Sequence, residues 1–369
     1  MSVGSPITPA RRKQVLRVLF ISLLLDLISF TFILPLFPNL LEFYRGLETQ
    51  PDSGTALSRI LHGLNAYKHS FRRPINDRYD IVLLGGALGS LPSRRPNAFP
   101  PADLARFRAA AQHATALARA GHWPHVRTVP KPFPPWPVSE ATTQGIWGVQ
   151  HLLHPAMPAA DRAVFAESYF GDTMTGAVTA LLDCEEEDLV MELYNMLVCP
   201  PEDFALRWHR DDIGPDASAE EERERLGQPM LHAQWNLALY ADSSLLVVPG
   251  SHRRPRTDAE READPFEAKM PGQRVVAMEA GDVVFYDNNI LHRGVYDCTA
   301  ERMTLHGTMG LVGADAARAR NILQHGIGEW AGACEFGDLP PGMAGRAKGM
   351  QGRLMGMGRG GGVGYSQID

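Results

Sequence analysis

The stretch Trp208-His209-Arg210-Asp211 decides how the rest of this chain is interpreted. Side chains two residues apart on a strand point to the same side, so His209 and Asp211 can offer an imidazole and a carboxylate to one metal ion. Two imidazoles and one carboxylate on one face of an octahedron, with three positions open, is the arrangement that holds non-haem Fe(II). The pattern therefore predicts an iron site whose third ligand comes from elsewhere in the chain.

His292 is our candidate for the third ligand. It lies in Ile290-Leu291-His292-Arg293-Gly294, after a predicted strand and beside a glycine. His252, in Pro249-Gly250-Ser251-His252, competes with it by spacing alone. On the residues alone both remain open, and we favour His292.

Arg302 and Thr304 follow His292 at a distance that a β-hairpin can fold back beside the third ligand. A guanidinium can grip a carboxylate through two parallel hydrogen bonds, and a hydroxyl two residues further shares its face. An acid such as 2-oxoglutarate suits both ends of this arrangement. Its keto-acid group chelates iron, and its far carboxylate would meet Arg302 and Thr304.

The composition narrows the class of protein. The chain has 369 residues, of which 44% are hydrophobic, which suffices for one large or two modest domains with packed cores. The net charge is −6, whereas nucleic-acid binding usually requires an excess of basic residues, so no nucleic-acid partner is expected. Four cysteines without a CxxC pair indicate reduced thiols rather than a disulfide framework.

Residues 1–95 differ from the rest. Residues 16–38 form an apolar run of the length that spans a bilayer, with Asp26 in its middle. With Leu25-Asp26-Leu27 and Ile33-Leu34-Pro35-Leu36-Phe37-Pro38, this run resembles the first transmembrane helix of a major facilitator transporter. Residues 81–91 resemble the start of the second helix but are too short to span. We interpret 1–95 as a truncated transporter-like segment, from a real fusion or a gene-model artefact, with membrane contact through residues 16–38 alone.

From residue 97 onward, the sequence predicts a soluble domain over 97–335 and a Gly- and Met-rich tail over 336–369. Helical patterns cover about 100–120, 159–170 and 174–182. Alternating apolar residues then predict strands over 189–198, 204–208, 231–240, 245–248, 274–278, 282–286 and 302–306. This order favours a β-sandwich or barrel buttressed by helices. We expect the insertions at 216–225 and 255–269 to be solvated loops or a lid, and the tail from Pro340 to be disordered or loosely docked.

About residues 99–330 resemble the phytanoyl-CoA dioxygenase family of Fe(II)/2-oxoglutarate oxygenases. The matching pieces are Trp208-His209-Arg210-Asp211, Val248-Pro249-Gly250-Ser251-His252, Gly281-Asp282, residues 288–294 and residues 302–304. The resemblance implies a mainly β fold, a double-stranded β-helix (jelly roll) with flanking helices. It implies Fe(II) on His209, Asp211 and His292, with 2-oxoglutarate and O₂ as co-substrates and ascorbate as reductant. It also makes His252 part of a turn and places Asn195 at the co-substrate.

Single residues distinguish the expected oxygenase chemistry from competing activities. Zinc hydrolysis needs a general-base Glu near the ligands, as in HExxH, and the sequence has none there. Halogenases of this kind lack the carboxylate ligand, whereas Asp211 is present. We therefore expect hydroxylation of a small organic molecule by a cytoplasmic domain. The alternative from another class is a non-catalytic β-barrel binding module, or a membrane-anchored protein with an inert site.

Overall fold

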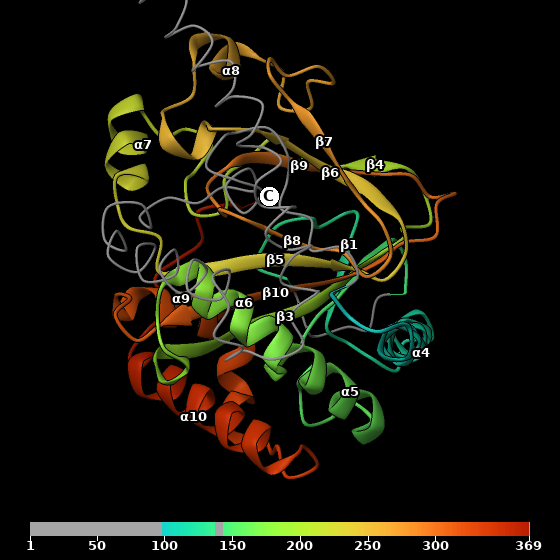
Figure 1. The fold of residues 1–369 in the computed structure, drawn as a ribbon. Coiled ribbons are helices and arrows are strands. Elements are labelled where there is room, and N and C mark those ends of the chain that lie inside the picture. The colour runs from blue at the N-terminus through green and yellow to red at the C-terminus, as the bar shows by residue number, and fades with distance from the viewer. Residues whose placement is uncertain (1–97, 137–142, 369) are drawn as a thin grey trace, which may run out of the picture. The chain divides into compact units, whose positions relative to one another are not determined.

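The computed structural model describes residues 98–136 and 143–368, which contain two antiparallel sheets (Figure 1). The large sheet contains, in spatial order, β1 (Val126–Thr128), β2 (Ile146–Val149), β3 (Leu189–Val198), β10 (Met303–Leu311), β5 (His232–Ala238) and β8 (Val283–Tyr286). The small sheet contains β4 (Phe204–Ala205), β9 (Leu291–Tyr296), β6 (Asp242–Val248) and β7 (Arg274–Met278).

The path of the chain links the two sheets repeatedly. From β3 to β6 each successive strand lies in the other sheet, β7 stays beside β6, and β8, β9 and β10 alternate again. Segments far apart in sequence therefore become neighbours, as where β10 lies between β3 and β5. The predicted two-sheet arrangement is confirmed, and β3 and β7 have the bounds that the sequence predicted.

Helices cover the face of the large sheet that points away from the small sheet (Figure 1). They are α4 (Pro101–Arg119), α5 (Ala159–Phe170), α6 (Asp172–Leu182) and α10 (Pro341–Met357), with α9 (Ala316–Gln324) following β10. Short 3-10 turns occupy η1 (Glu186–Asp188), η2 (Ser251–Arg253), η3 (Ile327–Glu329) and η4 (Ala331–Ala333). The fold is thus mixed α/β, with more helix than the mainly β expectation allowed.

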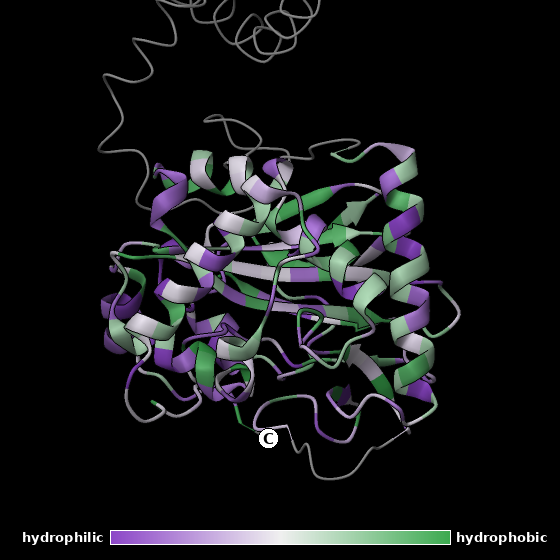
Figure 2. Ribbon diagram, turned by 90° about the horizontal axis from the view of Figure 1, so that it is seen from below, coloured by the Kyte–Doolittle hydropathy of each residue, from purple (hydrophilic) through white to green (hydrophobic). Residues whose placement is uncertain are grey.

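The alternation of side chains in β5 shows how the layers form. Trp235 and Leu237 are fully buried against the helices, in one cluster with α5 residues. Gln234 and Asn236 point the other way, into a cavity between the sheets. Figure 2 shows hydrophobic residues along the strands and mixed hydrophilic and hydrophobic residues along the covering helices. One face of the large sheet thus belongs to the core, and the other carries polar groups.

The C-terminal region corrects the sequence-based expectation. Residues 341–357 form α10, and Ala347, Met350 and Leu354 on one of its faces are fully buried in the main core. Apolar residues at this spacing form a helical stripe even among glycines, which individually disfavour helix. The expectation of a disordered or loosely docked tail is therefore wrong.

The two charged insertions are also more ordered than expected. They form α7 (Ala219–Leu226) and α8 (Asp258–Glu262). Glu222 of α7 is fully buried and forms ion pairs with Arg210, Arg256 and Arg261. The insertions are therefore packed against the segment that carries Arg210, and the solvated-loop expectation is wrong for this part of them.

Among residues 98–136 and 143–368, no helix has the length and apolar character needed to cross a membrane. The predicted span at 16–38, and the transporter-like segment 1–95 that contains it, lie outside the described residues.

Candidate metal centre and adjoining cavity

Backbone pairing brings His209 next to His292. The chain after β4 continues alongside β9, where the Leu206 amide donates to the Gly294 carbonyl at 2.9 Å. His209 and His292 then exchange both backbone hydrogen bonds at 3.0 Å. Residues paired in this way project their side chains to the same side, and the two imidazole centroids lie 4.3 Å apart.

Asp211 completes a cluster of three possible metal ligands. Its Oδ1 atom lies 3.5 Å from Nε2 of His209 and 3.6 Å from Nε2 of His292. The three ligand atoms all lie within 4.8 Å of one another. The structure thus brings together the three residues that the sequence proposed as ligands, whereas His252 lies outside this cluster.

The outer ring nitrogens show that both histidines are poised to bind a metal. Nδ1 of His209 lies 2.8 Å from the Arg207 carbonyl, and Nδ1 of His292 lies 2.8 Å from the Ile290 carbonyl. Because a carbonyl only accepts, each Nδ1 carries a proton, which leaves Nε2 as the ring atom that can bind a metal. Burial, with the neighbouring His209, lowers the pKa of His292 to about 4. His292 is therefore neutral at pH 7, as a metal ligand must be.

A hydrogen bond from Gln234 orients the Asp211 carboxylate. Nε2 of Gln234 donates to its Oδ2 at 3.0 Å, which leaves Oδ1 directed at the two histidines. Burial opposes the charge of Asp211, but His292 and His209 hold its pKa below the usual range. The carboxylate is thus ionised and oriented, and the donor set of two imidazoles and one carboxylate fits a divalent metal.

The turn at 249–252 supports both ligand-bearing segments. The Arg210 guanidinium, almost fully buried, donates to the carbonyls of Ser251 at 2.9 Å and of Asn289. Oγ of Ser251 accepts from the Leu291 amide at 2.7 Å, next to His292. Gly250 has φ +79°, a conformation that favours glycine. The Pro-Gly-Ser-His motif is therefore a structural brace between the two ligand segments.

The predicted carboxylate anchor consists of Arg302 and Thr304. In the structure, both residues contact a carboxylate of the protein itself, that of Asp242. Asp242 Oδ2 lies 2.9 Å from Nε of Arg302 and 2.8 Å from Oγ1 of Thr304. Burial alone would lower the pKa of Arg302, but Asp242 raises it. Sequence reasoning missed Asp242, because its charge lies at the start of a strand with no recognisable motif.

Asn195, the third predicted co-substrate contact, is placed elsewhere. Its carboxamide oxygen accepts from the backbone amide of His151 at 2.9 Å, and it does not line the cavity beside the metal cluster. It lies opposite His306 on β10, which in turn lies opposite Asn236 on β5. The structure therefore does not bring Asn195 to the other predicted site residues.

The cavity beside the metal cluster has two lobes. The narrow lobe, of about 80 Å³, extends between the sheets to Arg302 and is also lined by Ser244. The wide lobe, of about 150 Å³, extends outward to α9 and to residues 365–367. Residues that line both lobes are Arg127, Trp147, Leu206, His209, Asp211, Gln234 and His306.

The narrow lobe presents donors that have no partner among the described residues. Buried atoms of this kind are Nη1 of Arg302, Oγ of Ser244, Nε of Arg127 and Nε1 of Trp147. Leaving a buried donor unpaired costs about 1–3 kcal/mol, so several around one lobe indicate a place for an acceptor. The lobe therefore fits an anionic ligand that reaches from the metal cluster toward Arg302.

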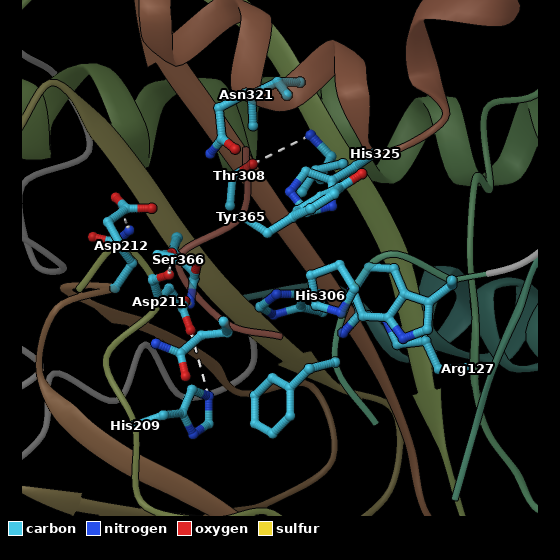
Figure 3. A pocket seen from close by; sticks show the side chains of 18 of the residues that line it. Arg127, His209, Asp211, Asp212, His306, Thr308, Asn321, His325, Tyr365 and Ser366 are labelled. Carbon is cyan, nitrogen blue, oxygen red and sulfur yellow. Dashed lines mark hydrogen bonds and ion pairs between the residues drawn. The ribbon is translucent and has the colours of Figure 1, made fainter. Parts of the chain in front are cut away.

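Several lining residues escaped the sequence analysis. Gln234 and Asn236 carried a detectable signal, because they are two polar residues on one face of an otherwise apolar strand. His306, whose Nδ1 lies 2.8 Å from Oδ1 of Asn236, was only the last residue of the strand predicted over 302–306. Arg127 carried no signal, since a lone arginine in a short strand is ordinary. Figure 3 shows His306 between Arg127 and the pair His209 and Asp211.

Comparison with known proteins agrees with this site. The family model described as phytanoyl-CoA dioxygenase matches residues 95–296, more than half of the chain. The chain therefore belongs to the phytanoyl-CoA dioxygenase family. It is an enzyme of the Fe(II)/2-oxoglutarate-dependent oxygenase class, for which Fe(II), 2-oxoglutarate and a small-molecule substrate are typical.

Solved structures with similar folds include AviO1 from Streptomyces viridochromogenes, at 19% identity and a TM-score of 0.42. This match covers 60% of the present chain and 90% of AviO1. HygX from Streptomyces hygroscopicus, solved with nickel and 2-oxoglutarate bound, has 16% identity and a TM-score of 0.39. That match covers 59% of the present chain and 81% of HygX.

A separate, partial match confirms the transporter resemblance. Major facilitator superfamily domain-containing protein 10 of Mus musculus is 42% identical over 82 residues, which are 22% of this chain and 17% of that protein. The Homo sapiens protein is 40% identical over 78 residues, 21% of this chain and 16% of that protein. The chain thus spans about a sixth of these relatives.

Proposed function

We propose that this protein is an Fe(II)- and 2-oxoglutarate-dependent dioxygenase that hydroxylates a small organic molecule. His209, Asp211 and His292 hold the iron. The observation that carries this proposal is the convergence of three ligand atoms within 4.8 Å, with both Nδ1 atoms committed to backbone carbonyls. When bound, Fe(II) with 2-oxoglutarate and O₂ supplies the oxidation, with ascorbate as a reductant that keeps the iron active.

The protein's own residues bind and orient the co-substrate and exclude water from the site. The narrow lobe takes 2-oxoglutarate, and its unpaired Nη1 of Arg302 and Oγ of Ser244 hold the far carboxylate. Thr304 acts through Asp242, because its hydroxyl donates to the carboxylate oxygen that accepts from the Arg302 guanidinium. Asn195 has no direct contact in this scheme, which revises the sequence-based assignment.

The reaction type follows from Asp211. A carboxylate at this position occupies the place that a halide takes in related halogenases, and Gln234 keeps that carboxylate oriented. Hydroxylation is therefore the outcome that the ligand set favours. The wide lobe, open toward α9 and residues 365–367, receives the organic substrate.

We further infer that strands β3 to β10 form the double-stranded β-helix that the family resemblance implies. Support comes from the spatial orders β3-β10-β5-β8 and β4-β9-β6-β7, in which the strands pair as two interleaved sheets. We assign residues 97–335 to the oxygenase domain, 336–369 to a C-terminal extension of it, and 1–95 to the transporter-like segment.

Succinate formation tests the proposed function. Full-length protein with Fe(II), ascorbate and 2-oxoglutarate should release succinate, and chelation of the iron should stop the release. The variant His113→Ala, at an exposed histidine of α4, serves as a control and should behave as the unmodified protein. A folded protein that binds no iron and forms no succinate would instead be a non-catalytic binding module.

A further inference from the structure

Three guanidiniums line the two lobes, and two of them are neutralised by carboxylates. Arg302 pairs with Asp242 at 2.9 Å. Arg318 pairs with Glu192 at 2.6 Å and lies 3.7 Å from Asp212. Arg127, the third, has no ion pair with a carboxylate within residues 98–136 and 143–368, and its Nε is buried without a hydrogen-bond partner.

The position of Arg127 is fixed by aromatic rings rather than by charge. Its guanidinium carbon lies 4.4 Å from the centroid of Trp136 and 5.6 Å from that of Trp147. Its aliphatic part packs closely over Gly148, where an added Cβ would meet it at 3.1 Å. Cation–π contacts orient a guanidinium without neutralising it. Arg127 is thus held in place with its charge uncompensated.

Among the described residues that line the two lobes, no carboxylate forms an ion pair with Arg127. Burial lowers the pKa of His306 to about 3 and that of His325 to about 4, so both are neutral. Burial also lowers the pKa of Arg127, to about 10, which leaves it charged at neutral pH. Asp211 is a proposed metal ligand, and Asp212 is held by Asn288 and Arg318.

We propose that Arg127 binds a carboxylate of the organic substrate, which makes that substrate a small carboxylic acid. This inference rests on the proposed function and names the substrate class. A guanidinium can hold a carboxylate through two parallel hydrogen bonds. The rest of the molecule lies in the wide lobe against Phe133, Leu206 and Trp136, which favours an apolar body.

Arg302 and Arg127 differ in which lobes they line. Arg302 and Ser244 line only the narrow lobe, where the co-substrate is placed, whereas Arg127 lines both lobes. In Figure 3, Arg127 lies across the cavity from His209 and Asp211, with His306 between them. A substrate gripped at Arg127 would therefore present its body toward the metal cluster.

Matched acids and amides test the proposal. The probes are phenylacetate, 3-phenylpropanoate, octanoate and indole-3-acetate, each beside its primary amide. Their binding is measured by calorimetry on full-length protein loaded with Ni(II) and 2-oxoglutarate, a metal chosen to prevent turnover. We expect at least one acid to bind, and its amide to bind at least about ten-fold more weakly, as loss of a charge-assisted hydrogen bond implies.

Substitutions at Arg127 test whether this residue causes the difference in binding between acids and amides. Arg127→Met should weaken acid binding about ten-fold more than it changes 2-oxoglutarate binding, and Arg127→Lys should recover part of the loss. Arg108→Met is the matched control, because Arg108 lies over the Tyr240 ring at 4.9 Å and lines neither lobe. It should leave both dissociation constants unchanged.

Three outcomes would contradict a role for Arg127 in binding the substrate carboxylate. Amides that bind as tightly as acids, an Arg127→Met variant that binds acids normally, or a panel in which no acid binds would each overturn the proposal. A variant that loses 2-oxoglutarate rather than the acid would make Arg127 a co-substrate residue instead. Absence of succinate formation with Fe(II) would count against the proposed function alone, because calorimetry with Ni(II) still reports on Arg127.

Discussion

The metal cluster and the outer wall of the wide lobe are built in different ways. Each metal ligand is fixed by a hydrogen bond, to a nearby backbone carbonyl for the two histidines and to Gln234 for Asp211, and all three ligands lie within the family match at 95–296. The outer wall combines the loop at 132–136 with α9 and residues 365–367, of which the last two lie beyond that match. The metal ligands thus lie wholly within the family match, whereas the wide lobe is completed in part by segments beyond it.

The two regions also differ in how completely their polar groups are paired. At the metal cluster, the outer nitrogens and the second carboxylate oxygen all have partners. In the lobes, Nε of Arg127, Nη1 of Arg302, Oγ of Ser244 and Nε1 of Trp147 have none among the described residues. The first pattern is that of a site prepared for a metal, and the second that of a site completed by its organic ligands.

The largest expected effect is at the metal cluster. Asp211→Ala removes the one charged ligand, so metal affinity and succinate formation should fall by more than the roughly 10–100-fold typical of residues that only support a ligand. Metal content after dialysis and succinate formation measure the two losses. Asp172→Asn, at an exposed carboxylate on α6, is the control. Wild-type metal content in Asp211→Ala would remove Asp211 from the ligand set.

A smaller and more selective effect is expected at the inner end of the narrow lobe. Arg302→Met removes a charge-assisted grip, so the concentration of 2-oxoglutarate needed for half-maximal succinate formation should rise about 10–100-fold. Metal content should stay unchanged, because Arg302 is not a ligand. A normal 2-oxoglutarate requirement would show that the co-substrate assignment is wrong.

The single variant also leaves Asp242 buried without its partner, which destabilises proteins strongly. The double variant Arg302→Met with Asp242→Asn removes both charges and should unfold at a higher temperature than the single variant. It should still need more 2-oxoglutarate than the unmodified protein. This pair of measurements separates lost binding from lost stability.

The sequence could predict the metal cluster because its determinants are local or periodic. His209 and Asp211 share a face through their spacing, and His292 follows a strand that alternation made visible. The bounds of β3 and β7 were predicted for the same reason. The family resemblance implied the jelly roll and the ligand set, whereas the backbone pairing of His209 with His292 was not predicted.

The contacts of Arg302 and Arg127 and the packing of α10 could not be predicted, because they depend on packing between distant segments. Nothing in the sequence links Asp242 to Arg302, 60 positions away, or places Arg127 between two indoles. Glycines hid the buried stripe of α10, since composition is a weaker guide than the spacing of Met350 and Leu354. These features arise from tertiary contacts that have no local signature.

The smallest expected effect is at the tail. Nε2 of Gln367 donates to the carbonyls of Arg210 at 2.9 Å and Ile213 at 2.8 Å, which attaches the tail beside Asp211. Each such hydrogen bond contributes about 1 kcal/mol, so Gln367→Ala should loosen this attachment without unfolding the domain. We expect faster tryptic cleavage after Arg359 and unchanged metal content.

Gln112→Ala is the matched control, because Gln112 also donates a side-chain hydrogen bond, to the Tyr240 hydroxyl, but on the exposed side of α4. Its rate of cleavage after Arg359 should equal that of the unmodified protein. If Gln367→Ala instead released the metal, the tail would belong to the metal centre. The two regions would then be one unit, because the Arg210 and Ile213 carbonyls flank Asp211 and their loss of partners would have disturbed the ligand itself.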